Sequence, residues 1–162
     1  MTVSTMSKRL LALMLPLFAA LTVACPLEFA CDGRYQLERS FFREPAGATV
    51  ERLRRYELPD QYKIFRYGID RIEPPAFELA DPIAERGPIA VPFLLEQLNG
   101  TPNDKTVNDV LLIFMAMARL KTYDVQRDLA LMETLSSKIS TMRDPFWKTE
   151  AMRSLENIRR PS

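Results

Sequence analysis

Apolar residues recur at helical spacing through most of this 162-residue chain. The clearest run, in residues 58–72, has intervals of three, four and three: Tyr62, Phe65, Ile69 and Ile72. This spacing places one apolar stripe along an amphipathic helix, which Pro74 and Pro75 then stop. Gly68 lies inside the predicted helix, where it either weakens the helix or marks a close contact with another one.

The stretch 80–98 is the one around which the other helices are expected to pack. It predicts two short helices hinged at Gly87, and the second of them opens with Pro88. Four apolar residues fall on one face of that second helix: Val91, Leu94, Leu95 and Leu98. We expect the remaining helices to cover this face.

Two longer helices are predicted after this pair. Residues 104–120, preceded by a cap at Asn103 or Asp104, are apolar nearly all round, so this helix is expected in the middle of the bundle. The helix predicted over 128–142 is amphipathic, with five residues on its apolar face: Leu129, Met132, Leu135, Ile139 and Met142.

Two further helices complete the expected set. Asp144 and Pro145 form a cap and first-turn signal, which predicts a last helix over 145–159. A short helix is predicted over 49–56, with Thr49 as its N-cap.

In residues 26–48 the apolar residues recur at no sustained spacing. Residues 35–42 within this segment are expected to form either a short strand or an extended arm. The predicted fold class is therefore all-α, a compact antiparallel helical bundle with an irregular N-terminal arm. We expect residues 1–24 as a signal peptide, 25–48 as the arm and 49–160 as the helical domain.

The first 24 residues have the pattern of a secretory signal. Lys8 and Arg9 precede an apolar run at 10–21, and small residues follow as far as Ala24. The run is short for a membrane span and polar sequence follows it, which favours a cleaved signal over a retained anchor. The chain is thus expected to be exported to the periplasm, either lipid-anchored to a membrane or soluble.

Two cysteines follow this segment and leave two alternatives open. Residues 21–25 resemble a bacterial lipobox, in which Cys25 would be acylated and become the new N-terminus, although Thr22 stands where Leu is usual. Alternatively, Cys25 and Cys31 form a disulfide in an oxidising compartment. Lipidation would leave Cys31 as an odd thiol and would make the arm a membrane tether.

Part of the chain is similar to a known structural repeat. The residues concerned are Gly87-Pro88, Val91-Pro92, Leu94-Leu95 and Leu98, then Asp104, Val110-Leu111 and Ala118 to Leu120. Over 81–120 this order resembles one HEAT-type helical repeat, and no second copy follows. The resemblance implies stacked antiparallel helical hairpins and a protein-binding role in a small exported bacterial protein.

The composition excludes several chemistries. The chain has no histidine and only two cysteines, so histidine-dependent nucleophiles and His- or thiolate-ligated metal sites are not expected. It contains no P-loop, dinucleotide fingerprint or EF-hand loop, and we expect no cofactor and no metal. Removal of residues 1–24 takes two of the 22 cations and none of the 21 acids, leaving a net charge of −1, which gives no reason to expect nucleic acid.

Carboxylate chemistry is the catalytic option that remains. Asp81 and Glu85 would share a helix face, with Glu78 one turn before them. A glycosidase needs two carboxyl groups at a set separation, one of them with a raised pKa. A hydrolase of cell-wall material is therefore a third hypothesis, behind solvated helix charges and a non-enzymatic role.

Basic and aromatic residues alternate in residues 51–73, a combination that can bind anionic polymers or phosphorylated headgroups, and the loop 74–77 follows them. Five acids in 51–73 nearly balance six cations there, so core aromatics and solvated ion pairs are the competing interpretation. The candidate binding surface consists of Arg54, Arg55, Arg66, Tyr67, Arg71 and Phe77.

The sequence therefore predicts a non-catalytic binding or scaffold module of the bacterial cell envelope. Its expected partner is an envelope protein, with a possible membrane tether through a lipid on Cys25. The alternative is a periplasmic inhibitor or immunity-type protein that occupies another protein's active site.

Overall fold

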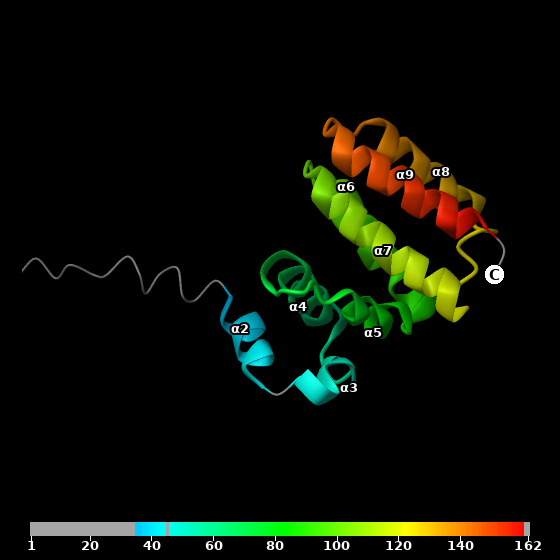
Figure 1. Ribbon diagram of the computed structural model, residues 1–162. Helices are drawn as coiled ribbons and strands as arrows, with labels where there is room; N and C mark the ends of the chain where they lie inside the picture. Colours follow the sequence, from blue (N-terminus) through cyan, green and yellow to red (C-terminus); the bar gives the residue numbers. More distant parts are fainter. Residues whose placement is uncertain (1–34, 45, 161–162) are drawn as a thin grey trace, which may run out of the picture. The chain divides into compact units, whose positions relative to one another are not determined.

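The computed structural model describes residues 35–44 and 46–160, which form helices joined by turns and short loops (Figure 1). The α-helices are α2 (Gln36–Arg43), α3 (Thr49–Leu53), α4 (Leu58–Arg71), α5 (Ala80–Ala84), α6 (Val91–Gly100), α7 (Asp104–Leu120), α8 (Leu129–Ser140) and α9 (Pro145–Arg159). Three 3-10 turns join them: η2 (Ala46–Ala48), η3 (Phe77–Leu79) and η4 (Gly87–Ile89). The predicted all-α class is confirmed.

Two of the predicted features lie outside the described residues, namely the signal segment and both candidate cysteines, Cys25 and Cys31. Among residues 35–44 and 46–160, no helix combines the length and the apolar character that crossing a bilayer requires.

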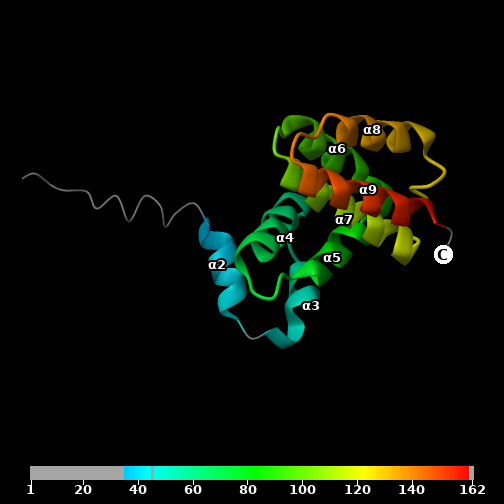
Figure 2. The ribbon, with the colours of Figure 1, turned by 45° about the horizontal axis from the view of Figure 1, so that its top comes forward.

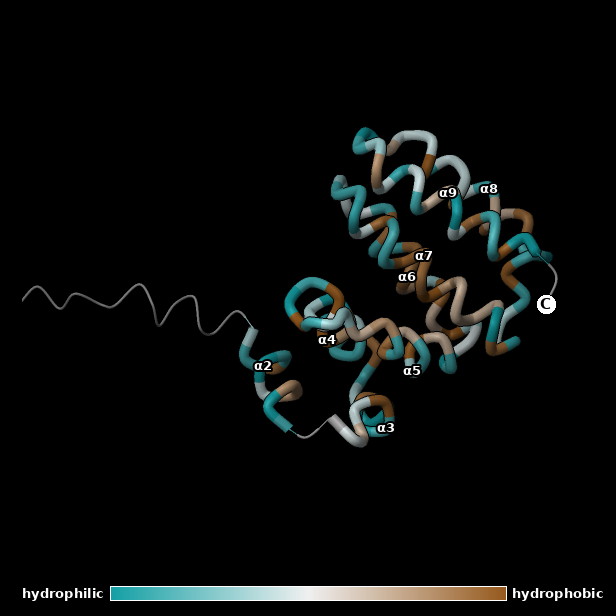
Figure 3. Tube along the Cα trace, viewed as in Figure 1, coloured by the Kyte–Doolittle hydropathy of each residue, from teal (hydrophilic) through white to brown (hydrophobic). Residues whose placement is uncertain are grey.

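Helix α7 is the centre of the packing, as its nearly continuous apolar sequence predicts. It contacts α5, α6 and α9, and ten of its 17 residues are buried. Figure 3 shows the hydrophobic colour concentrated along α7 and the helices beside it. Val110, Leu111, Ile113 and Phe114 are fully buried, and each such side chain contributes about 1.5–3 kcal/mol through removal from water.

The hinge predicted at Gly87 is confirmed and has a tertiary cause. Gly87 has a φ of +57°, and a Cβ atom there would lie 2.8 Å from the Thr122 carbonyl oxygen. The Thr122 hydroxyl donates a hydrogen bond of 2.6 Å to the Ala84 carbonyl, so the turn after α7 is fixed against the hinge. The second helix begins at Val91 and not at Pro88, because Pro88 belongs to the 3-10 turn η4.

The predicted caps of the later helices are confirmed. The Asn103 side chain accepts hydrogen bonds from the backbone N–H groups of Lys105, at 2.9 Å, and Thr106, at 3.4 Å. The Asp144 carboxylate accepts from Phe146, at 2.9 Å, and from Trp147, at 3.2 Å. Each interaction satisfies N–H groups that the first turn of a helix leaves without an intrahelical acceptor.

Two local predictions are wrong. Ala48, and not Thr49, occupies the N-cap of α3, because the 3-10 turn η2 leads directly into that helix. Of the five apolar residues predicted for the helix at α8, Leu135, Ile139 and Met142 are buried and Met132 is partly buried. Leu129 is instead 79 % exposed, and Leu131 is buried. The contact with α9 decides which face is buried, and Leu129 lies on the other side of the first turn.

The segment predicted as a strand or extended arm is instead helix α2, which packs on α4 (Figure 2). Phe41 is buried, and Gly68 of α4 provides room for Phe42: a Cβ atom at Gly68 would lie 3.0 Å from Phe42 Cζ. Gly68 therefore marks a close helix contact, one of its two predicted roles. The compact helical unit begins at Tyr35 and not at Thr49.

Candidate binding site

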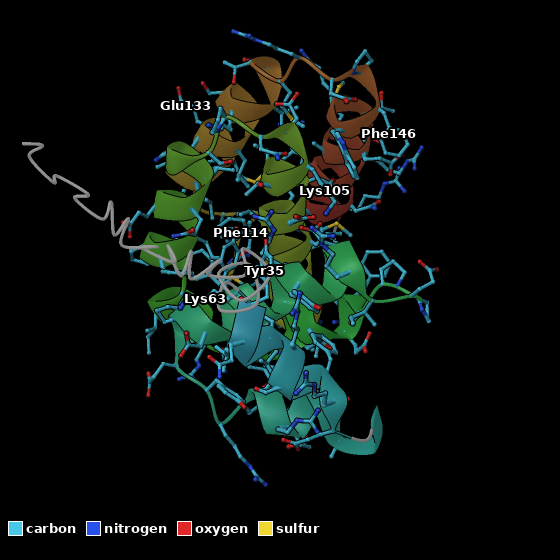
Figure 4. The ribbon with its side chains drawn as sticks, turned by 90° about the vertical axis from the view of Figure 1, so that its left-hand side faces the viewer. Tyr35, Lys63, Lys105, Phe114, Glu133 and Phe146 are labelled. Atoms are coloured by element: carbon cyan, nitrogen blue, oxygen red, sulfur yellow. The ribbon has the colours of Figure 1, made fainter. Side chains whose placement is uncertain are left out.

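Helices α2, α4 and α6 together surround an open hollow of about 300 Å³. We call it the α2–α4 hollow. Its lining is polar and aromatic: Tyr35, Glu38, Tyr62, Lys63, Arg66, Tyr67, Asp70, Arg71 and Gln97. Figure 4 labels Tyr35 at the start of α2 and Lys63 on α4, in the part of the molecule where these helices meet. A hollow of this size suits one or two amino-acid side chains.

Aromatic contacts hold the walls of the hollow in place. The Tyr67 ring stacks on Phe42 with centroids 5.7 Å apart, and it contacts Tyr35 at 5.6 Å. Tyr62 meets Phe93 of α6 edge to face at 5.5 Å. These pairs link α2 and α6 to α4, so the rings are positioned before any ligand arrives.

Glu38 lines the hollow without a directly paired charge. The residue is 7 % exposed and forms no ion pair and no hydrogen bond with any described residue. Its charge helps to raise the pKa of Lys63, although the main cause of that shift is the hydrogen bond of 2.8 Å from Lys63 Nζ to Asp60. Lys63 is thus hydrogen-bonded elsewhere and attracts the Glu38 carboxylate only through space, so Glu38 has no ion pair among the described residues.

The other charges form a connected network between α4 and α7. Arg66 Nε lies 3.0 Å from Asp109 Oδ2, and Lys105 Nζ lies 3.3 Å from Asp109 Oδ1. Lys105 also pairs with Asp70 and lies 5.6 Å from the centre of the Trp147 ring on α9. All four ionisable groups of this network, Arg66, Asp70, Lys105 and Asp109, therefore have a partner of opposite charge within it.

Burial dominates the electrostatics of Asp109 and Tyr62. Asp109 is 1 % exposed, and burial raises its pKa above the ordinary value of 3.8 despite the attraction of Lys105 and Arg66. Burial likewise raises the pKa of Tyr62. The Tyr62 hydroxyl lies near Arg66 but forms no well-aligned hydrogen bond among the described residues, and its oxygen is enclosed by the protein.

The structure divides the predicted binding surface. Arg66, Tyr67 and Arg71 come together in the α2–α4 hollow. Arg54 does not belong to it, because its guanidinium forms hydrogen bonds of 2.6 and 2.5 Å with Glu85 and holds α3 against α5. Arg55, in the turn after α3, is exposed away from the hollow lining.

Phe77 lies at a different place from the hollow. It is 55 % exposed and lines a shallow groove between η3, α5 and α7, together with Asp81, Met115 and Arg119. The six predicted residues therefore do not form one continuous surface.

The carboxylates of the hydrolase hypothesis have separate partners. Asp81 pairs with Arg119 of α7, whereas Glu85 pairs with Arg54. The hydrogen bond from Arg54 lowers the pKa of Glu85 below its ordinary value of 4.5. A general acid in glycoside hydrolysis needs the opposite shift, so this arrangement does not favour acid catalysis by Glu85.

Sequence reasoning missed Tyr35, Glu38 and Gln97 as site residues. Tyr35 and Glu38 fall in the segment that was expected to be irregular, although Leu37 and Phe41 already have a helical spacing of four. The sequence around Gln97 has no feature that predicts a site residue. Gln97 lines the hollow because α6 lies beside the other lining helices.

No protein-family model, curated protein or solved structure matches this chain. The resemblance to a HEAT-type repeat therefore stays a prediction. Among the described residues, no three His, Cys, Asp or Glu side chains are grouped so that they could hold a metal ion.

Proposed function

We propose that the chain is a non-catalytic binding module of the bacterial cell envelope, which recognises an envelope protein through the α2–α4 hollow. The N-terminal segment would export it to the periplasm, where it is either anchored by a lipid on Cys25 or soluble. The observation that carries the proposal is Glu38, a residue that is 7 % exposed and lines the hollow, where its carboxylate forms no ion pair with a described residue.

Two further observations support a binding role. The hollow is rich in tyrosine and arginine, the residue types that are enriched where protein interfaces gain most of their affinity. Its rings are already fixed by packing against Phe42 and Phe93, which reduces the entropy lost when a partner binds.

The second candidate function is a periplasmic inhibitor that inserts a side chain into another protein's active site. The exposed Phe77 favours it, since this ring stands at the edge of the groove formed by η3, α5 and α7. The two functions differ in the surface that meets the partner.

Site-specific photo-crosslinking in the native host separates them. A crosslinking amino acid is placed at Arg71 in the hollow, at Phe77, and at Glu133 on α8 as the control. Figure 4 labels Glu133 on a helix that contributes nothing to the hollow. The proposal predicts one envelope protein crosslinked from position 71 and not from 133. A specific product from position 77 alone would favour the inhibitor, and identical products from 71 and 133 would refute a binding role for the hollow.

A further inference from the structure

We infer that the α2–α4 hollow recognises a peptide segment that carries a basic side chain and an acidic side chain close together. The basic side chain would enter the hollow and meet Glu38, while the acidic group would meet Arg71 at the rim. This inference rests on the proposed function of the hollow and adds the chemistry of its ligand.

The first step is the uncompensated charge of Glu38. Glu38 is 7 % exposed as a residue, so its carboxylate loses part of its hydration, which costs free energy unless an opposite charge or hydrogen-bond donors replace the water. The neighbouring cations do not do so, because Lys63 is bonded to Asp60 and Arg66 is paired with Asp109. A ligand that supplies an ammonium or guanidinium group would therefore bind with a charge-assisted hydrogen bond.

The second step is the number of donors on a basic group. A lysine ammonium carries three donors and an arginine guanidinium carries five. A basic group can thus pair with Glu38 and keep its remaining donors hydrogen-bonded to water in the open hollow, whereas an aliphatic side chain offers Glu38 no donor.

The third step is the rim. Arg71, the last residue of α4, is exposed and forms no ion pair with any described residue. Among the described residues, Glu38 and Arg71 are therefore the two charged residues of the hollow that have no ion pair. Glu38 is negative and largely buried, whereas Arg71 is positive and exposed. A ligand with its positive group inside and its negative group outside matches this arrangement.

The test is an NMR titration of the isotope-labelled exported protein with the capped peptide Ala-Lys-Asp-Ala. Matched peptides carry Nζ-acetyl-lysine in place of lysine, or asparagine in place of aspartate. We expect amide shifts to concentrate in residues 35–38 and 62–71, and the acetylated peptide to bind about tenfold or more weakly. Equal binding of the lysine and acetyl-lysine peptides would overturn the inference.

Variants locate the two contacts. Glu38→Gln should weaken binding by about tenfold or more, whereas the control Glu133→Gln, on the exposed face of α8, should leave it unchanged. Arg71→Gln should weaken the aspartate peptide but not the asparagine peptide. Because Arg71 is exposed and unpaired, its variant tests the ligand chemistry even if Glu38→Gln perturbs α2. Undiminished binding by both Glu38→Gln and Arg71→Gln would contradict the assignment.

The proposed function and this inference fail in different ways. Loss of specific crosslinking from position 71 would remove the hollow as the binding site. Specific crosslinking together with equal affinity for the charged and acetylated peptides would leave the binding site in place and remove only the basic-acidic ligand.

Discussion

Arg66 of α4 and Asp109 of α7 lie with 3.0 Å between Nε and Oδ2, and this ion pair joins the wall of the α2–α4 hollow to the central helix. Asp109 is almost completely buried, whereas Arg66 extends from it to the hollow lining. The pair therefore couples the position of the candidate site to the stability of the core.

This coupling predicts an unusual pH dependence. Because the pKa of Asp109 is raised in the folded protein, the folded state binds its proton more tightly than the unfolded state does. The contribution of Asp109 to stability is therefore greatest below the ordinary pKa of 3.8 and is lost as the pH rises through the folded-state pKa. Lys105 and Arg66 limit the rise in the pKa of Asp109 without reversing it, whereas the like charge of Asp70 adds to it.

The variant Asp109→Asn removes this titration. Urea unfolding from about pH 4 to about pH 7 should show the stability of the variant rising relative to the wild type as the pH increases. Two parallel stability curves over this range would contradict the burial-dominated account of Asp109.

The hinge at Gly87 predicts a local effect of one methyl group. Gly87→Ala places a Cβ atom 2.8 Å from the Thr122 carbonyl oxygen and forces a left-handed backbone on alanine, which alone costs about 1–2 kcal/mol. Gly100→Ala is the matched control, because nothing lies within 4 Å of its added Cβ atom. We expect thermal unfolding to show clear destabilisation of the first variant and a change within about 0.5 kcal/mol for the second. Equal effects would rule out the packed hinge.

The contact between α2 and α4 predicts that Gly68 controls the hollow. A Cβ atom there would lie 3.0 Å from Phe42 Cζ and 3.1 Å from Ala76 Cβ. Gly68→Val adds two further methyl groups and should displace α2 while the α7–α9 core stays folded. Hydrogen exchange should then increase over residues 36–43 and remain low over 107–117. Unchanged protection of α2 would show that Phe42 does not need the space at Gly68.

Export predicts a processed N-terminus. Intact mass spectrometry of the protein from its native host should show a chain that begins at Cys25. Added acyl mass would establish the lipid anchor, whereas a gain of two hydrogens on reduction would establish the disulfide with Cys31. An unprocessed chain would contradict export.

The parts of the fold that depend on local sequence could be predicted. Asn103 and Asp144 cap helices because their side chains reach the N–H groups of the next turn, and Gly87 bends the chain where a positive φ is needed. Helix α2 could not be predicted in this way. An eight-residue helix gains little from its own hydrogen bonds, and it is stabilised by Phe41 and Phe42 against α4, residues that are distant in sequence.

Only the part of the candidate site that α4 contributes could be predicted from the sequence. The alternation of basic and aromatic residues in α4 pointed to Arg66, Tyr67 and Arg71, which share a helix. Glu38 is a site residue because α2 packs beside them, and Gln97 because α6 does. Tertiary contacts of this kind leave no mark in the local pattern of either helix.

The most direct test of the account compares Glu38→Gln with Glu133→Gln in the native host, each with the photo-crosslinking amino acid at position 71. The two substitutions remove one carboxylate each, but only Glu38 lies in the hollow. If Glu38 binds the partner, crosslinking in the Glu38→Gln protein should fall about tenfold or more at equal protein abundance and remain unchanged in the Glu133→Gln protein. Equal crosslinking in the two proteins would show that the buried carboxylate is not part of the binding site.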